Sequence, residues 1–564
     1  MSEKKFVTYE QFGAIGDGVA NDFAAINSAH EYANENGLEV RADDSKTYRI
    51  SDTRIDGKVV TVKIRTNVYW GNANFIIDDS ELHAWDGTGM CGANIFEVVS
   101  DYPDINTTDS ELLSKLYGIG PETKKVDLGL GYPAMIVPFN EEYRVYRRRG
   151  SSYANGGAYQ HEVVLLDKDG NIDPDTPLMF TYDKVTRLQI FRTDMEHLVI
   201  DGGIFTTKAS KDNVFAYNKD GKYVIKDSYF GRGLIVSRSY TVVKNLKHYV
   251  TNEVTIQEQI ESDFRYGGAH YSGFFYAKNS TDVTFENCVL TGRRCYRTPE
   301  GLTNYAGTMG TYDFGAFSMN KIRLVGCDQC NFYVNKYTAE AVDENHPDAV
   351  LSMDCMIAPK WAKICWGIGG TNFCKNMEYI NSRLSRFDAH AGLYHGKVID
   401  STVNAISVVG NGNMIVENTR FVSGGLGSVN NSFFYLRDDY GSTWDGDMLI
   451  KDCTIETNED YFFIANVIWA NWDYGYKCYL PSMTIDNLVV KGKPETKVHL
   501  IRREFIEKEP RLHLPTLTNG DENVNAVVPS RYIKVLNNNT NQVYYLIDSP
   551  VFETTELEGN IVRD

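Results

Sequence analysis

The sequence predicts an all-β chain wound into a parallel β-helix, a solenoid whose coils stack along one axis. At 564 residues the chain is too long for one ordinary globular core, so several domains or an elongated repeat fold are expected. Its 36 Tyr and 47 Gly residues, with recurrent Val, Ile, Thr and Asn, favour short strands and frequent turns. The most specific observation is a short unit that recurs along the chain.

In the recurring unit, apolar positions alternate, and then Asn, Asp or Gly is followed by a small residue and another apolar one. The alternation predicts a strand with one buried side, and Asn tolerates the left-handed backbone of a tight corner. The copies are "LVIDGGIF" (198–205), "VTFENCVL" (283–290), "IRLVGCDQ" (322–329), "MEYINSRL" (377–384), "KVIDSTV" (397–403), "MIVENTRF" (414–421), "MLIKDCTI" (448–455) and "MTIDNLVV" (483–490). We expect one residue of each copy after the first to stack at a common corner: Asn287, Gly326, Asn381, Asp400, Asn418, Asp452 and Asn487.

The position after each corner residue is small in most copies. These residues predict a ladder of small buried side chains, namely Cys288, Cys327, Ser382, Ser401, Thr419 and Cys453. The ladder explains these cysteines without disulfides or metal. Cys327 and Cys330 form a CxxC, but no second ligand pair completes a zinc site, so no metal is expected.

The N-terminus predicts a short helix that leads into strands. Asn21 or Asp22 is a capping candidate, Gly37 ends the helix, and strands follow at Val40 and at 48–50. The apolar face is made of Phe23, Ile26, Ala29, His30 and Ala33.

The pattern F-G-A-x-G-D-G-x-x-x-D-x-x-A-I, followed by the helix, a strand and T-Y-x-I, resembles the N-terminal cap of the pectate-lyase-like superfamily. Members are right-handed parallel β-helix proteins, among them polygalacturonase-like glycoside hydrolases, polysaccharide lyases and phage tailspikes. Phe23 stands where Thr is usual, and "RADD" (41–44) replaces a Pro-Gly turn. The resemblance implies a right-handed helix and says little about function.

Four regions are predicted. Residues 1–99 form the cap and first coils, and 100–195, which lack the unit, form an inserted β-rich subdomain. Residues 196–495 form the main helix with the active-site groove. Residues 496–564 form a C-terminal β cap or an oligomer contact, with a hairpin near "NNNTNQ", so a homo-oligomer is compatible with the sequence.

The charge pattern excludes some partners. A formal net charge of −18 without a basic face argues against nucleic acid and mildly against a strongly anionic glycan. No apolar run approaches the length of a membrane span or a signal peptide. A cytoplasmic protein is therefore expected, or a secreted one whose signal has been removed.

The stretch "LSRFDAHAGLYHG" (384–396) is the first candidate for chemistry. If Phe387 and Ala389 point into the core, then Arg386, Asp388 and His390 share an outer, exposed face. A solvated ion pair is the plain alternative for this arrangement.

The stretch "LRDDYGSTWDGD" (436–447) has the same form. With Phe434 and Leu436 inward, Arg437 and Asp439 face outward, so Arg437-x-Asp439 repeats Arg386-x-Asp388. Asp438 then marks a strand end or has its own partner, since an unpaired buried carboxylate is costly.

One coil without an inserted loop (405–412) separates the two stretches. Asp388 and Asp439 are therefore predicted to lie two rungs, that is two turns of the solenoid or about 9.5 Å, apart. That is the upper end of the roughly 6.5–9.5 Å of inverting glycosidases. One carboxyl would protonate the leaving oxygen, while the other, kept ionised by Arg386 or Arg437, would activate water.

Aromatic and imidazole side chains near these stretches are further candidates. Tyr440 and Trp444 are predicted sugar platforms, with packed loop residues as the alternative, and His395 and Trp366 are further binding candidates. Residues 365–450 also resemble right-handed β-helix proteins of gut-type bacteria related to polygalacturonases, which implies a carbohydrate-related role.

The sequence therefore predicts a glycoside hydrolase that cleaves an oligo- or polysaccharide with a pair of Asp residues and no cofactor. The alternative within enzymes is a lyase or epimerase that uses His390 or Tyr440, with Arg and, for a lyase, calcium. The alternative outside enzymes is a tailspike-like glycan-binding protein.

Overall fold

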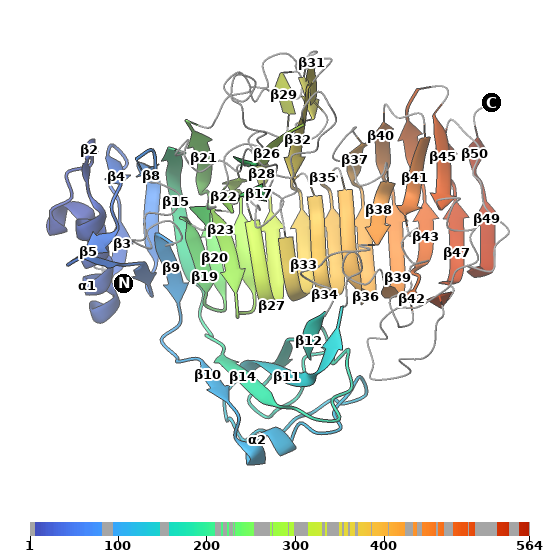
Figure 1. Cartoon of the computed structure of the whole chain (residues 1–564), viewed down its shortest axis with the longest axis horizontal. Helices are drawn as coiled ribbons and strands as arrows, with labels where there is room; N and C mark the ends of the chain where they lie inside the picture. The colour runs from blue at the N-terminus through green and yellow to red at the C-terminus, as the bar shows by residue number, and fades with distance from the viewer. Residues whose placement is uncertain are drawn as a thin grey trace, which may run out of the picture.

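A computed structural model describes most of the chain. The described residues are 6–81, 94–146, 157–208, 216–217, 223–224, 229–230, 232–252, 271–272, 274–290, 293–297, 314–329, 333–335, 349–351, 355–358, 361–366, 370–384, 386–403, 405–423, 432–436, 443–457, 461–466, 478–493, 496–501, 527–528, 530–540 and 552–562. Strand pairing within them confirms an all-β parallel β-helix whose coils follow one another along the long axis from the N- to the C-terminus (Figure 1).

Each coil contributes to three faces. Face 1 is built from β7 (Val62–Ile64), β9 (Phe96–Val99), β19 (Leu234–Ser237), β23 (Phe275–Lys278), the first halves of β27 (Phe314–Val325), β33 (Gly370–Ile380), β34 (Arg386–Ile399) and β36 (Ala405–Glu417), and β38 (Ser432–Leu436), β41 (Tyr461–Asn466) and β45 (Lys497–Ile501). All of these neighbours pair in parallel.

Face 2 comes next along each coil. It contains β1 (Phe6–Thr8), β3 (Glu39–Arg41), the first halves of β8 (Val68–Asp78) and β15 (Leu198–Lys208), then β20 (Thr241–Lys244), β24 (Val283–Glu286), the second halves of β27, β33, β34 and β36, and β39 (Trp444–Lys451), β43 (Ser482–Asp486), β47 (Ser530–Leu536) and β49 (Phe552–Glu558).

Face 3 closes the coil with shorter strands. It contains β2 (Asp17–Asn21), β4 (Thr47–Ile50), the second halves of β8 and β15, β21 (Lys247–Thr251), β25 (Val289–Leu290), β28 (Asp328–Gln329), β35 (Thr402–Val403), β37 (Arg420–Ser423), β40 (Thr454–Thr457), β44 (Val489–Lys491), β48 (Asn539–Thr540) and β50 (Ile561–Val562).

The remaining short strands lie outside the three faces. They are β5 (Arg54–Ile55), β6 (Lys58–Val59), β16 (Ala216–Tyr217), β17 (Tyr223–Val224), β18 (Tyr229–Phe230), β22 (Tyr271–Ser272), β26 (Arg293–Arg297), β29 (Tyr333–Asn335), β30 (Ala349–Leu351), β31 (Cys355–Ala358), β32 (Trp361–Trp366), β42 (Cys478–Tyr479) and β46 (Val527–Val528).

The turn from face 2 to face 3, here called the asparagine corner, is the one that the sequence predicted. Its residues all have a positive φ between 45° and 66°: Asn245, Asn287, Gly326, Asn381, Asp400, Asn418, Asp452, Asn487, Asn537 and Gly559. Amide side chains link successive rungs, as in Asn418 Nδ2 to Asp400 Oδ1 at 2.6 Å. The predicted ladder of small residues follows this corner and is buried.

The N-terminal cap also forms as predicted. Helix α1 (Phe23–Asn36) follows the short helix η1 (Tyr9–Phe12), begins after Asp22 and ends at Gly37 with φ 64°. The Asp22 carboxylate accepts the N–H of Ile15 at 2.7 Å, so it fixes the preceding turn instead of capping the helix.

The predicted C-terminal hairpin near 537–542 is wrong. β47 pairs in parallel with β43, and β48 pairs in parallel with β44. Asn537, with φ 54°, is therefore another asparagine corner. Turn residues between two apolar runs fit both arrangements, and parallel stacking extends the existing core.

The stretch without the recurring unit forms a separate small sheet, the insert. It contains β10 (Ile105–Thr107), α2 (Ser110–Ser114), β11 (Ala134–Val145), β12 (Ala158–His161), β13 (Val164–Leu166) and β14 (Arg187–Arg192), with antiparallel pairing. The insert leaves the helix after β9 and returns before β15, at the turn from face 1 to face 2, here called the insert corner. It lies beneath the lower ends of β33, β34 and β36 in Figure 1.

Candidate functional site

Three of the predicted site residues lie together on β34. The Asp388 carboxylate forms an ion pair with Arg386, with 2.8 Å between Nη2 and Oδ2. His390 Nε2 is 3.5 Å from the same Oδ2. Phe387 and Ala389 point into the helix core, as alternation predicted. The three polar side chains therefore share the outer side of face 1.

The predicted exposure of this outer side is wrong. Arg386, Asp388 and His390 are 3 %, 1 % and 5 % exposed. Phe373, Ala391 and Val409, beside the neighbouring insert corner, belong to the hydrophobic core of the insert, so the insert packs on that corner. Strand alternation shows which side faces away from the helix core, but it carries no information about a cover contributed by residues far away in the chain.

The predicted register between the two candidate stretches is also wrong. Asp388 pairs with Ser407, and Ser407 pairs with Tyr435, so Tyr435 and not Asp439 stands two rungs from Asp388. Val408 pairs with Leu436 and Gly410 with Trp444. In the sequence, seven residues therefore separate Leu436 from Trp444, where the preceding coil has Val409 alone between Val408 and Gly410.

Several predicted site residues fall outside the described residues. These are Arg437, Asp438, Asp439 and Tyr440, and the side chain of Trp366. Their proposed roles stay predictions.

Trp444 is not a sugar platform. Its side chain is fully buried within the main hydrophobic core, opposite Gly410. The packed alternative is therefore the correct one. After the turn at the insert corner, alternation places Trp444 inward and leaves Asp445 exposed and Asp447 half-buried.

His395 lies beyond the insert corner, on face 2. Its Nδ1 accepts the N–H of Asn413 at 3.2 Å. Partial burial lowers the pKa of His395, against an opposing effect of the Asp175 carboxylate. The imidazole is thus half-buried beside the insert, on a different face from Asp388.

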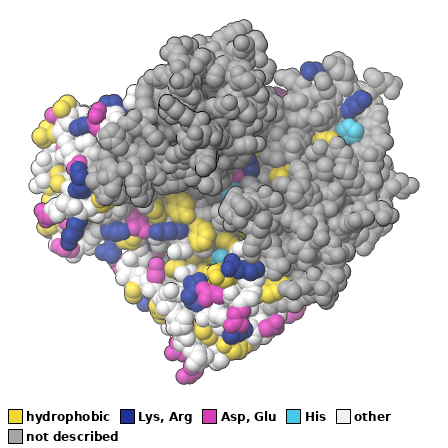
Figure 2. All heavy atoms as spheres, viewed as in Figure 1, with side chains coloured by type: hydrophobic (Ala, Val, Ile, Leu, Met, Phe, Trp, Pro, Cys, Tyr) yellow, Lys and Arg dark blue, Asp and Glu magenta, His cyan; other side chains and the backbone are white. Residues whose placement is uncertain are grey.

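Asp388 belongs to an outward-facing row that crosses six rungs of face 1. The row runs through residues paired in register, namely Tyr276, Gly315, Gly370, Asp388, Ser407 and Tyr435. Two glycines leave bare backbone between the Asp388 carboxylate and half-buried Tyr276. Figure 2 shows hydrophobic side chains gathered on this side of the molecule, between the N-terminal coils and the insert. Sequence reasoning missed Ser407 and Tyr435, because their only signal is an outward place in an alternating run.

A buried ion pair fixes the insert to the helix beside this site. Lys375 Nζ lies 2.5 Å from Glu162 Oε2, and both side chains are 1 % exposed. The same carboxylate accepts the N–H groups of Met179 at 2.7 Å and Phe180 at 2.9 Å. Burial lowers the pKa of Lys375, against the opposing effect of Glu162.

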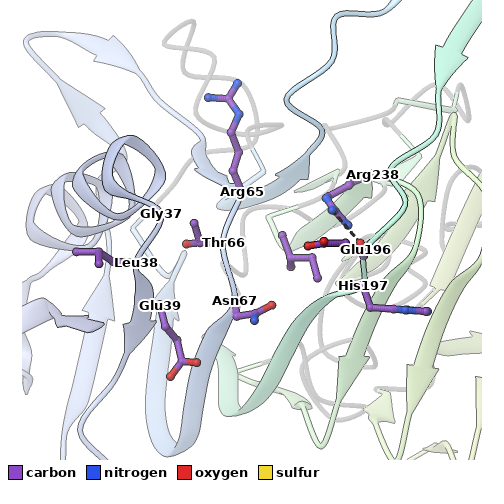
Figure 3. A pocket seen from close by; sticks show the side chains of 10 residues that line it. Gly37, Leu38, Glu39, Arg65, Thr66, Asn67, Glu196, His197 and Arg238 are labelled. Atoms are coloured by element: carbon purple, nitrogen blue, oxygen red, sulfur yellow. Dashed lines mark hydrogen bonds between the residues drawn. The ribbon is translucent and has the colours of Figure 1, made fainter. Parts of the chain in front are cut away.

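A surface pocket of about 290 Å³ lies on earlier coils, between the end of α1 and the return of the chain from the insert. Figure 3 shows Arg65, Thr66, Asn67, Glu196, His197 and Arg238 around it. Arg238 donates to the Glu196 and Ser239 carbonyl oxygens, both at 3.0 Å, and Arg65 pairs with Asp101 at 3.3 Å. These cations therefore have structural partners.

Two further observations concern metals and membranes. Within the described ranges, no group of three or more His, Cys, Asp or Glu side chains is arranged to hold a metal ion. No helix in this part of the chain is long and apolar enough to cross a membrane.

Comparison with known proteins finds no matching family model and no matching curated protein, so membership of the pectate-lyase-like superfamily stays a prediction. Solved structures do match. The tailspike protein gp49 from Pseudomonas phage LKA1 is 11 % identical, with a TM-score of 0.43 over 94 % of this chain and 81 % of that one. The mannuronan C-5 epimerase AlgE4 A-module from Azotobacter vinelandii is 9 % identical, with a TM-score of 0.41 over 97 % of this chain and 99 % of that one. The surface adhesin PfbA of Streptococcus pneumoniae is 9 % identical, with a TM-score of 0.39 over 99 % of this chain and 92 % of that one.

Proposed function

We propose that the protein is a glycoside hydrolase that binds an oligo- or polysaccharide along face 1 and uses Asp388 as its catalytic base. The observation that carries this proposal is the Arg386–Asp388–His390 cluster at the end of a glycine-lined row. The Arg386 guanidinium at 2.8 Å stabilises the negative charge that a base needs. Low solvent exposure strengthens this interaction.

The row also lacks side chains on one side of the carboxylate. Gly315 and Gly370 occupy the two outward positions next to Asp388, so no side chain projects there. Tyr276, three rungs or about 14 Å from Asp388, supplies an aromatic ring at the other end. A flat backbone floor between a ring and a carboxylate suits a chain of sugars.

The proposed acid comes from residues 437–440. This stretch follows Leu436, the last residue of β38, directly in the sequence. Asp439, with Asp438 as its neighbour, is the carboxyl that we propose protonates the leaving oxygen. Asp388 takes a proton from water, whose oxygen attacks the anomeric carbon as the glycosidic bond breaks.

The test is digestion of a panel of neutral and uronate-containing glycans, read as new reducing ends. Asp388→Asn is expected to lower kcat about 10²- to 10⁴-fold, the usual contribution of a general base. The matched control is Asp400→Asn, twelve residues later on the same coil, where Asn fits the corner backbone as Asn418 does. Cleavage by the wild type that persists at full rate in Asp388→Asn would overturn the assignment. Binding without any cleavage would instead support a tailspike-like binding protein.

A second activity is favoured by one contact. His390 lies 3.5 Å from Asp388, close enough for the carboxylate to orient the imidazole as a base that removes a sugar proton. This is the chemistry of a lyase or epimerase, and a lyase could also use calcium. A lyase would generate an unsaturated sugar that absorbs in the ultraviolet, whereas a hydrolase generates reducing ends alone. In that case His390→Gln would lose more activity than Asp388→Asn.

A further inference from the structure

Ser407 is a buried hydroxyl without an assigned role, one rung from Asp388. Its side chain is 0 % exposed, and among the residues that the structure describes its Oγ has no hydrogen-bond partner. Ile406 and Val408 on either side belong to the helix core, so Ser407 faces outward, toward the same side as Asp388. Buried hydroxyl groups nearly always have a partner, and one that lacks a protein partner indicates a bound water or ligand group.

The spacing between Asp388 and Ser407 suits a single bridging water. The two residues are register partners on adjacent parallel strands, whose backbones are about 4.8 Å apart. A water that makes two hydrogen bonds of about 2.8 Å can span side chains at that separation. The guanidinium of Arg386 and the imidazole of His390 already occupy Asp388 Oδ2. We assign the second hydrogen bond of the water to the Asp388 carboxylate.

We propose that Ser407 holds the water that Asp388 activates, and that Ser407 is a positioning residue of the site. This inference rests on the proposed function for its catalytic part. During the reaction, the water gives one proton to Asp388, and its oxygen forms the new bond to the anomeric carbon. The glycosidic C–O bond breaks, and the leaving oxygen takes the proton of the acid. Ser407 stays unchanged and fixes the direction of attack.

The first test does not depend on activity. A high-resolution crystal structure of the wild type is expected to show an ordered water within hydrogen-bond distance of both Ser407 Oγ and the Asp388 carboxylate. In Ser407→Val this water should be absent. A hydroxyl that donates directly to a protein oxygen, with no water between the two residues, would refute the proposal even if the protein proves to be a hydrolase.

The second test uses stability and kinetics. Ser407→Ala is expected to lower kcat about 10- to 100-fold with KM within twofold, since misplacing a reacting group costs rate more than binding. Its Tm should fall slightly, because a water-mediated bond is lost. A hydroxyl with no partner at all would give the opposite sign, a higher Tm in the Ala variant. Ser407→Thr, which keeps the hydroxyl, should recover part of the rate.

The matched control is Ser401→Ala at the asparagine corner. Ser401 is equally buried, and its hydroxyl donates to the Ile399 carbonyl at 2.7 Å and accepts the N–H of Ser382 at 3.1 Å. This variant should lose stability and keep its kcat. An equal loss of kcat in both Ala variants would assign the Ser407 effect to folding. A wild type that cleaves no glycan would reject the proposed function. The crystallographic test would then show only whether the water between Ser407 and Asp388 is present.

Discussion

Acid should loosen the contact between the insert and the helix, because a neutral histidine is buried in it. His161 of β12 stacks on Phe139 of the insert, with ring centroids 4.7 Å apart, and contacts Phe373 of the β-helix with the two rings tilted and their centroids 3.8 Å apart. Burial lowers the pKa of His161 to about 4, with a smaller contribution from Arg187. The charged imidazolium therefore fits this contact poorly.

The size and sign of the effect follow from the two pKa values. The unfolded chain titrates near 6.5 and the folded one near 4, so the unfolded state binds more protons between these values. The stabilisation by neutral His161 is complete above about pH 6.5 and is lost as the pH falls toward 4. At about 1.4 kcal/mol per pH unit, the loss is about 2 kcal/mol at pH 5 and about 3 kcal/mol at pH 4.

The measurement compares urea denaturation of the wild type and His161→Phe between pH 7 and 4.5. Hydrogen exchange of the β12 and β13 amides, corrected for intrinsic pH dependence, shows whether the change is at the insert. Phe removes the titrating group and keeps the stacking, so the stability difference between the two proteins should shrink or reverse below pH 6.5. His197→Phe, at an exposed position, is the control and should change nothing. A difference between wild type and His161→Phe that is constant with pH would refute the reasoning.

Three further predictions concern packing and backbone. Lys375→Met leaves Glu162 buried without its cation, so we expect urea denaturation to show a loss of about 3–5 kcal/mol, and the added change Glu162→Gln should recover much of it. Asn487→Ala, at φ 52°, should cost about 1–2 kcal/mol, whereas Asn487→Gly should cost less, as thermal unfolding can show. Trp444→Ala should destabilise by about 3–5 kcal/mol without changing glycan affinity in titrations well below its Tm, because the ring is core and not a sugar platform.

The parts of the fold that were predictable have local causes. The cap helix has a polar residue before it and a left-handed glycine after it, and both signals lie within a few residues of the ends. The asparagine corners need φ near 50°, and few residues tolerate that backbone, so the sequence shows them at nearly every rung. Asn537 was missed because the turn residues around it also fit a hairpin.

The parts of the candidate site that were not predictable depend on long-range packing. The inward positions of Phe387 and Ala389, and the shared side of Arg386 and Asp388, followed from alternation. The burial of Asp388 did not, because alternation shows only which side of a strand faces away from the helix core and not what lies over that side. The predicted register between Asp388 and Asp439 was wrong because the sequence has seven residues between Leu436 and Trp444, where the preceding coil has only Val409 between their partners. This difference in length leaves the alternation on both sides intact.

Two of the three corners of each coil, the asparagine corner and the insert corner, constrain the chain in opposite ways. At the asparagine corner, side-chain amides bond to the rung before, as Asn487 does to Asp452 at 2.7 Å, so added residues would break a continuous ladder. The insert corner has no such ladder among the described residues, and its length varies from one residue beside Val408 to the whole insert after β9. Segments can therefore be added at the insert corner, and also at the turn from face 3 to face 1, where 25 residues separate β15 from β19 and 40 separate β28 from β33. Asp388 stands on the strand that runs into the insert corner, and that position is the reason to look for its partners there.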